Sequence, residues 1–324
     1  MVFETKYGVI SDIHSANDNL SETIDYFKSK GVKELILNGD IADIKHTLGA
    51  SQDEVANVLK IVGESNLFSY VQPGSHETVG MYAPVMTYFT GKYGNILNMN
   101  KIQKVKNVDH DLIFIPGSDF HSGGEYSFGD ELDSGLYVNS DEGIRTYAKY
   151  LKDGKNLSGA KLIDYHNINE VKKLNINPDN SIVICHVPRK FDSLENAVDV
   201  AYFASTEKGV ILPGIVVENM IKKQFGEVSY NDMLAIANHN GYELRVENRG
   251  NEKLAKLYGE LGIKKAISGH FHESAHKAHD LSGKIVEEGQ IVDELFWNSG
   301  CYKDGQTGIL TVNGNKASYE NIKL

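Results

Sequence analysis

The sequence predicts an α/β protein built around parallel β-strands. Strand-like and helix-like hydrophobic patterns alternate over the first hundred residues, and each later apolar run ends in a polar loop that carries glycine or histidine. With 324 residues, 41% hydrophobic and 24% charged, the chain can bury a core of ordinary size. Parallel strands need right-handed crossovers, and the loops at their carboxyl ends are where such sheets place their chemistry.

The first elements can be read from hydrophobic spacing. Leu20, Ile24 and Phe27 recur at helical spacing, and Gly31 provides a stop, so a helix is expected between the first two strands. Three short apolar runs predict the strands around it. The expected strand ranges are 7–11, 34–38 and 67–71.

A second helix is expected after the second strand. Ser51-Gln-Asp-Glu54 has the pattern of a capping box, and apolar residues recur at helical spacing from Val55 to Val62. Later apolar runs predict further strands and a closing β-hairpin that turns at Asn313-Gly314. The expected ranges are 111–116, 181–185, 266–268, 308–312 and 317–320.

Residues 1–324 are expected to form a single domain. Two stretches, at about 119–178 and 189–252, are longer, more polar and less periodic than the rest. We interpret both as excursions from one core, and as the segments that would surround a substrate.

Charge and composition exclude several classes of protein. The 33 basic and 44 acidic residues give a net charge of −11, which disfavours broad nucleic-acid binding. The longest apolar run, 209–217, is broken by Pro213-Gly214 and is too short to cross a bilayer, and no secretion signal is apparent, so we expect a cytoplasmic protein without membrane contact. Cys185 and Cys301 form no C-x-x-C pair. The oligomeric state is left open.

Five polar blocks follow predicted strands. Because the carboxyl ends of parallel strands meet at one edge of a sheet, we expect these blocks to share a site. Their mixture of imidazole and carboxylate suits Mn, Fe, Co or Zn. In chain order the blocks are Asp12-Ile-His14, Gly39-Asp40-Ile-Ala-Asp43, Gly74-Ser75-His76-Glu77, His186 and Gly269-His270-Phe-His272.

Strand geometry indicates how the ligands would be shared. Alternation at a strand end would put Asp12 and His14 on one face, and His270 and His272 on one face for the same reason. Asp40 ends the strand expected beside the one that carries Asp12. It is therefore the natural carboxylate to bridge two metal ions.

As an ordered set, D-x-H, G-D-x-x-D, G-N-H-[DE], a lone H and G-H-x-H resemble the motifs of the calcineurin-like metallophosphoesterases. The motifs extend from residue 12 to residue 272, and a matching glycine turn, Asn298-Ser-Gly300, follows. The resemblance implies the metallophosphoesterase fold, a four-layer sandwich of two mixed β-sheets flanked by helices. It also implies a dinuclear metal centre that hydrolyses phosphate esters.

The same resemblance implies a role for each matching residue. His76 would be the catalytic histidine, and Asp43 would be the carboxylate that orients it. The first ion would be held by Asp12, His14, Asp40 and His272, and the second by Asp40, His186 and His270.

The sequence departs from the family pattern at Ser75. The family has asparagine there, as a ligand of the second ion, and a hydroxyl is shorter and a poorer ligand than an amide oxygen. Ser75 is therefore expected to be a weak ligand. Ile44 and Pro73 stand where protein Ser/Thr phosphatases have arginines, which argues against a phosphoprotein substrate.

Other residues carry weaker signals. Glu77 is expected to be a solvated loop acid, because the orienting role goes to Asp43, which could itself be a solvated loop acid. His121, in a glycine-rich loop after a strand, and Arg189, three residues past His186, are candidate contacts for the substrate phosphate, with plain loop structure as the alternative. The histidines outside the blocks are assigned no chemistry.

The leading hypothesis is a phosphomonoesterase or phosphodiesterase that uses two divalent transition metal ions, for instance manganese, on a small-molecule or nucleotide substrate. One alternative is a nuclease of the same family, which the net charge disfavours. The other is a catalytically weakened metal-binding scaffold, for which Ser75 is the only support.

Overall fold

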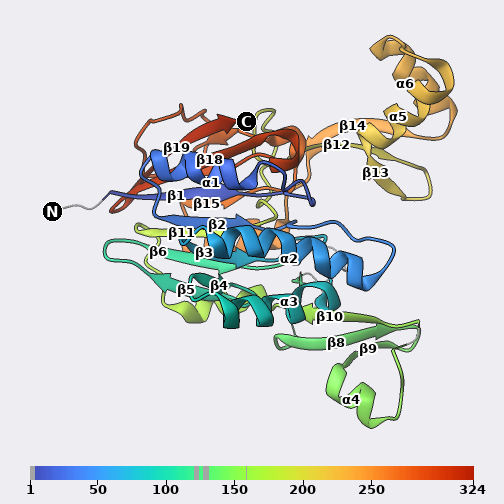
Figure 1. The fold of residues 1–324 in the computed structure, drawn as a ribbon. Coiled ribbons are helices and arrows are strands. Elements are labelled where there is room, and N and C mark those ends of the chain that lie inside the picture. Colours follow the sequence, from blue (N-terminus) through green and yellow to red (C-terminus); the bar gives the residue numbers. More distant parts are fainter. Residues whose placement is uncertain (1–3, 120–123, 127–130, 158) are drawn as a thin grey trace.

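The computed structural model describes residues 4–119, 124–126, 131–157 and 159–324. Two six-stranded mixed sheets dominate it (Figure 1). The first has the strand order β19-β18-β1-β2-β3-β4, in which β1 to β4 are parallel, β18 pairs antiparallel with β1, and β19 pairs antiparallel with β18. Its strands are β1 (Glu4–Ile10), β2 (Glu34–Asn38), β3 (Phe68–Gln72), β4 (Ile96–Asn98), β18 (Gln306–Asn313) and β19 (Lys316–Lys323).

The second sheet has the order β16-β17-β15-β11-β6-β5. The four central strands are parallel, and β5 and β16 are antiparallel edges. Its strands are β5 (Gln103–Lys106), β6 (Asp111–Ile115), β11 (Ser181–Cys185), β15 (Lys265–Ser268), β16 (Ala278–His279) and β17 (Leu295–Asn298).

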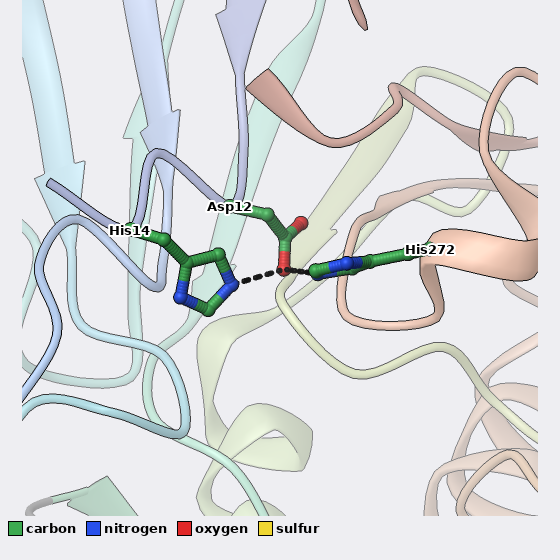
Figure 2. Close-up of side chains that lie close together, drawn as sticks. All are labelled: Asp12, His14 and His272. Atoms are coloured by element: carbon green, nitrogen blue, oxygen red, sulfur yellow. Dashed lines mark ion pairs between the residues drawn. The ribbon is translucent and has the colours of Figure 1, made fainter. Parts of the chain in front are cut away.

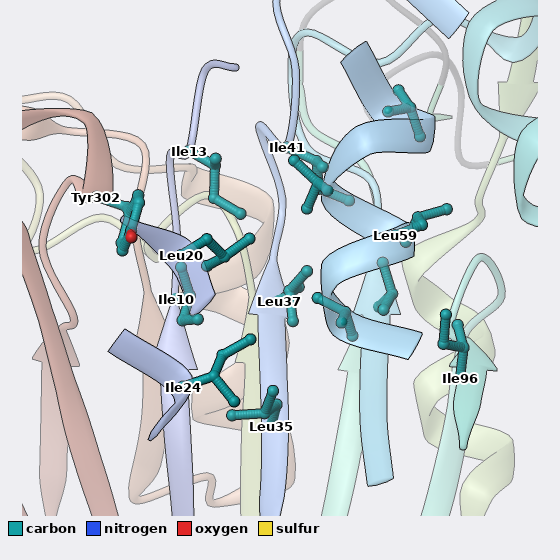
Figure 3. Packing of buried hydrophobic residues seen from close by; sticks show 14 of the residues in the cluster. Ile10, Ile13, Leu20, Ile24, Leu35, Leu37, Ile41, Leu59, Ile96 and Tyr302 are labelled. Atoms are coloured by element: carbon teal, nitrogen blue, oxygen red, sulfur yellow. The ribbon is translucent and has the colours of Figure 1, made fainter. Parts of the chain in front are cut away.

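Hydrophobic clusters define four layers. Val9, Ile36, Phe114 and Ile184 belong to the cluster shared by the two sheets. The outer face of the first sheet packs against α1 (Leu20–Ser29), α2 (Leu48–Glu64) and α3 (Val79–Lys92), as Figure 3 shows in part. The outer face of the second packs against α7 (Glu252–Leu261) and the 3₁₀ helix η1 (Ile168–Leu174). The predicted α/β class and the four-layer sandwich are confirmed.

Two local predictions need correction. Ser51 is not the N-cap of α2, because Thr47 holds that position and its side chain accepts a hydrogen bond from Ala50 N. The helix therefore starts before the predicted capping box. The closing hairpin forms between β18 and β19, but Asn313 still pairs with Lys316, so the turn lies one residue later than expected.

Two segments leave the sandwich. The first forms a small sheet from β7 (Gly124–Glu125), β8 (Gly135–Ser140), β9 (Gly143–Thr146) and β10 (Lys161–Tyr165), with α4 (Tyr147–Lys152). The second has its own small core and contains β12 (Val200–Ser205), β13 (Ile211–Pro213), α5 (Gly214–Phe225), α6 (Tyr230–His239) and β14 (Glu243–Asn248). In Figure 1 both project at the right of the view, the second segment near the top and the first near the bottom. Within the described ranges, no helix combines the length and apolar character needed to cross a membrane.

Candidate metal centre

The five polar blocks converge in space although they come from five different loops. Asp40, after β2, has its Oδ2 atom 3.1 Å from Nε2 of His186, after β11. Asp12, after β1, has its Oδ1 atom 3.4 Å from Nε2 of His272 and 3.9 Å from Nε2 of His14 (Figure 2). The expected shared edge of carboxylates and imidazoles is therefore present.

These side chains fall into groups that could hold metal ions. In each group the potential ligand atoms all lie within 4.8 Å of one another. Asp40 belongs to two groups, which is the position expected of a bridging carboxylate. In the described part of the chain the groups are Asp12 with His14 and His272, Asp40 with His186 and His270, His14 with Asp40 and His76, and His272 with Cys301 and Asp304.

Strained backbone, not strand alternation, brings the ligands together. β1 ends at Ile10, and Asp12 and His14 follow with φ angles of 55° and 47°. Asp40 and His270 also adopt positive φ, at 49° and 68°. Such left-handed conformations are costly for residues other than glycine and cluster at functional sites. Asp12 and His14 do lie together, but the expected cause was wrong, because both residues follow the strand and do not share one of its faces.

The same correction applies to the last block. His270 follows β15 with a left-handed φ, whereas His272 begins the 3₁₀ helix η2 (His272–Ser274). His270 consequently lies with Asp40 and His186, and His272 lies with Asp12 and His14. The two histidines therefore face different groups and do not share one face of a strand.

Glycine is required where the loops approach most closely. Gly39 has φ 83°, and a Cβ there would collide with Gly74 and the His186 ring. A Cβ on Gly74 would collide with the carboxylate of Asp40. These contacts explain why both G-D-x-x-D and the third block begin with glycine.

Asp40 is held by several hydrogen bonds from the third block. Its Oδ1 accepts from the backbone N–H groups of Ser75, at 2.5 Å, and His76, at 2.9 Å. The Ser75 hydroxyl donates to Oδ2 at 2.8 Å. Burial acts to raise the pKa of Asp40, but the surrounding histidines outweigh it and hold the pKa well below its usual range. Asp40 is thus kept ionised, as a metal ligand must be.

Glu77 is not a solvated loop acid. It is fully buried. Its Oε2 accepts from Gly74 N at 2.7 Å and Asp40 N at 3.2 Å, while Oε1 accepts from Ile41 N at 2.6 Å and Ala42 N at 3.1 Å. Burial and the nearby Asp40 charge raise its pKa to about 7. The carboxyl group ties together the two loops that carry Asp40 and His76, a role that no spacing in the sequence revealed.

Two histidines have one ring nitrogen fixed and the other unpaired. His14 Nδ1 contacts Asp43 Oδ1 at 2.8 Å, and His186 Nδ1 donates to the Asn38 carbonyl at 2.8 Å. In the described part of the chain, the buried Nε2 atoms of both rings find no hydrogen-bond partner. In a neutral ring with Nδ1 as donor, each Nε2 would direct a lone pair toward carboxylate oxygens, so a proton or a metal ion is needed between the two atoms. A divalent cation between nitrogen and oxygen resolves this clash, so the residues fit a metal centre.

The electrostatics also favour added positive charge. Burial would lower the pKa of His186, but Asp40 and Asp12 outweigh it and raise the pKa to about 10. Burial would likewise lower the pKa of His272, but the hydrogen bond to Asp12 contributes most to an opposite effect that raises the pKa to about 11. The pKa of His270 is lowered to about 4 by burial and by His186. The carboxylates therefore attract protons when no other cation is present, and metal ions would compete with those protons.

Asp43 contacts two histidines at once. Its Oδ1 lies 2.8 Å from His14 Nδ1 and 3.1 Å from His76 Nδ1, while Oδ2 lies 3.6 Å from Lys303 Nζ. Burial acts to raise its pKa, but the hydrogen bond from His14 is among the causes that lower it. His76 is 43% exposed, so its ring is accessible from solvent.

The 3₁₀ helix η3 (Tyr302–Asp304) is a part of the site that sequence reasoning missed. Lys303 reaches Asp43, and Asp304 Oδ2 lies 3.7 Å from His272 Nδ1. Backbone bonds from Tyr302 N to Ser11 O and from Lys303 N to Asp12 O attach this turn to the end of β1. The sequence did offer one signal for this turn: it follows the apolar run 295–298, as the ligand blocks follow other strands.

Of the two predicted substrate contacts, only Arg189 lies among the residues that the structure describes. His121 lies outside the described residues. The guanidinium of Arg189 lies over the ring of Phe191, 4.6 Å from its centroid, and over Phe296. Both rings belong to the hydrophobic cluster on the outer face of the second sheet.

The family profile described as Calcineurin-like phosphoesterase matches residues 5–274. This match confirms the resemblance drawn from the motifs. No curated protein matches the chain.

Among solved structures, TT1561 of Thermus thermophilus is similar, with 10% identity, a TM-score of 0.53 and coverage of 99% of this chain and 100% of that one. Another crystal structure has a TM-score of 0.56 at 10% identity, with the same coverage. A dimetal phosphatase from Danio rerio has a TM-score of 0.44 at 10% identity, with 98% of each chain covered. At these identities the first two show a shared fold only.

Proposed function

The chain belongs to the calcineurin-like phosphoesterase family, and from that premise we propose that it hydrolyses phosphate esters of a small molecule or nucleotide with two divalent metal ions. Manganese, iron, cobalt and zinc suit the mixed nitrogen and oxygen ligands. We do not expect nucleic acid as the substrate, because the net charge is −11.

The observation that carries this proposal is the pair of buried Nε2 atoms that face carboxylates. His14 and His186 belong to separate ligand groups, and Asp40 Oδ2 lies 3.9 Å from the first Nε2 and 3.1 Å from the second. Two ions that share Asp40 would satisfy both nitrogens. Divalent ions bound there would activate water and neutralise charge on the phosphoryl oxygens.

The protein residues would have two further roles, to hold the metal ions in place and to transfer a proton. Asp12, His14 and His272 would hold one ion, and His186 and His270 the other, with Asp40 between them. Ser75 would act on the second site through its hydrogen bond to Asp40, or as a weak ligand.

His76 would donate a proton to the leaving oxygen. Asp43 would accept from the Nδ1–H of the protonated ring, so that the Nε2–H is the proton transferred and the ring is left neutral. The exposure of His76 lets a substrate oxygen reach it from solvent. This intact pair favours an enzyme over a weakened scaffold.

The test is hydrolysis of a panel of monoester, diester and nucleotide substrates, with and without Mn²⁺ and with excess chelator. We expect turnover that depends on metal and is lost in chelator. Tight metal binding without turnover of any substrate would instead support the scaffold alternative.

A further inference from the structure

The turn after β17 holds a lysine at the open side of the metal centre. Lys303 Nζ is 3.6 Å from Asp43 Oδ2. Lys303 N donates to Asp12 O at 3.1 Å, and the preceding Tyr302 N donates to Ser11 O at 3.0 Å. The main chain therefore fixes this lysine beside the site, whichever group its ammonium contacts.

We propose that Lys303 binds the phosphoryl group of the substrate and makes the site prefer phosphate monoesters to diesters. The inference rests on the proposed function, since it names the substrate class of the same site. It concerns a residue that belongs to none of the motifs in the sequence.

The exposed side chains of the site mark where a substrate enters. Lys303 is 50% exposed, His76 43% and His272 38%, beside the exposed carboxylate of Asp304 at 57%, whereas Asp12 and Asp40 are almost fully buried. A phosphate that approaches from solvent meets the ammonium and the two imidazoles before it reaches the buried carboxylates. Lys303 is therefore positioned to contact a phosphoryl oxygen.

Asp43 does not require the lysine. Its Oδ1 is already held by His14 and His76, and an exposed ion pair such as that of Lys303 with Oδ2 contributes little. An ammonium on a flexible four-carbon chain can leave this partner for a more highly charged one. The ion pair with Asp43 then keeps the lysine close to the site when no substrate is bound.

The charge of the substrate determines the size of the effect. A phosphate monoester carries close to two negative charges at neutral pH, because its second pKa is about 6, whereas a diester carries one. Coulomb attraction to a single ammonium grows with that charge. Lys303 therefore stabilises a bound monoester more than a bound diester.

The experiment compares Lys303→Gln and Lys303→Arg with Lys45→Gln in Mn²⁺-loaded protein. Lys45 is a matched control, because it lies two residues after Asp43 but pairs with Glu54 at 3.7 Å. The measurements are KM and kcat for p-nitrophenyl phosphate and bis(p-nitrophenyl) phosphate, and binding of inorganic phosphate by calorimetry.

We expect Lys303→Gln to raise KM for the monoester and to weaken phosphate binding by about tenfold, in line with loss of a charge-assisted hydrogen bond. KM for the diester should rise less. Lys303→Arg should restore most of the loss, Lys45→Gln should match the wild type, and thermal unfolding should be unchanged in all three.

Two results would overturn the proposal. Equal loss of kcat on both substrates with unchanged KM and phosphate binding would mean that Lys303 only positions Asp43. Phosphate binding that is the same in wild type and Lys303→Gln would mean that it contacts no phosphoryl group. Failure of the proposed function would look different, since the wild type would then hydrolyse neither substrate.

Discussion

The two ends of the parallel strands both contain buried histidines beside aspartates, but in the described residues these histidines differ in whether their second ring nitrogen has a hydrogen-bond partner. At the start of β6, His110 has both ring nitrogens satisfied: Nδ1 contacts Asp109 Oδ1 at 2.7 Å, and Nε2 contacts the hydroxyl of Tyr7 at 2.7 Å. At the carboxyl ends, His14 and His186 have Nδ1 bonded and Nε2 without a hydrogen-bond partner in the described residues.

The comparison separates a structural histidine from a candidate ligand. Burial is the same, since His110 is 1% exposed and His186 is 0% exposed. The difference lies in the second ring nitrogen, because an unpaired buried polar atom is costly unless another group satisfies it. An unpaired imidazole nitrogen that faces carboxylates is therefore stronger evidence for a metal site than a histidine–aspartate contact alone.

The largest expected effect comes from the shared carboxylate. Asp40→Asn removes a charge that faces His14, His76 and His186. We expect metal affinity and turnover to fall by more than about 100-fold, since even residues behind the ligands cost 10–100-fold. Elemental analysis and steady-state kinetics measure the two effects.

Asp109→Asn is the matched control at the opposite end of the strands. Asp109 also contacts a buried histidine, but its substitution should lower stability and leave metal content and turnover unchanged. If both variants lose metal equally, the distinction between the two ends of the strands is wrong.

The second effect separates proton transfer from metal binding. His76→Ala should lower kcat by about 100-fold or more, the usual contribution of a general acid, while metal content stays the same. Asp43→Asn should lower both kcat and metal affinity, because Asp43 also contacts His14 Nδ1. Loss of metal in His76→Ala would show that His76 is a ligand, and its assigned role would have to be abandoned.

A smaller effect is expected at Ser75. Ser75→Asn replaces a hydroxyl that donates to Asp40 with a longer amide, whose oxygen can reach an ion directly. We expect the midpoint of metal activation to move to lower concentration by about tenfold or less. Activity is titrated with Mn²⁺ for both proteins in the same buffer. Overlapping curves with two ions bound in each would mean that serine does not weaken the second site.

The smallest effect on activity comes from the opposite end of the strands. Tyr7→Phe removes the hydroxyl that contacts His110 Nε2 and leaves that buried nitrogen with only a distant contact to Asn107. The free energy of unfolding should fall by about 1–3 kcal/mol, with metal content and turnover unchanged. Chemical denaturation checks the first part. A change in turnover would mean that the two ends of the strands are coupled.

Hydrophobic spacing was sufficient to predict the α/β class and the central strands, whereas the four-layer sandwich was predicted from the family resemblance. The apolar runs that became β2, β6 and β11 were found with boundaries correct to within a residue, because short buried strands leave a strong local signal. The cap of α2 was placed wrongly, since Ser51 and Thr47 are both good N-cap residues and the choice depends on where the preceding loop ends.

The ligand blocks were predictable because each follows a strand, but their supporting residues were not. Glu77 was misjudged because its four backbone donors belong to loops that only the fold brings together. Lys303 and Asp304 lie about 290 residues from Asp12 in sequence and contact the site through tertiary packing. The left-handed φ of Asp40 was also not predicted, although aspartate adopts such angles more often than most residues.

Metal stoichiometry tests the central claim most directly. The protein is incubated with Mn²⁺, free metal is removed, and bound manganese is measured by elemental analysis. We predict two ions per chain in the wild type, loss of phosphate-ester hydrolysis in chelator, and recovery on addition of Mn²⁺. Less than one bound ion per chain would contradict the claim that the unpaired nitrogens of His14 and His186 form a metal centre.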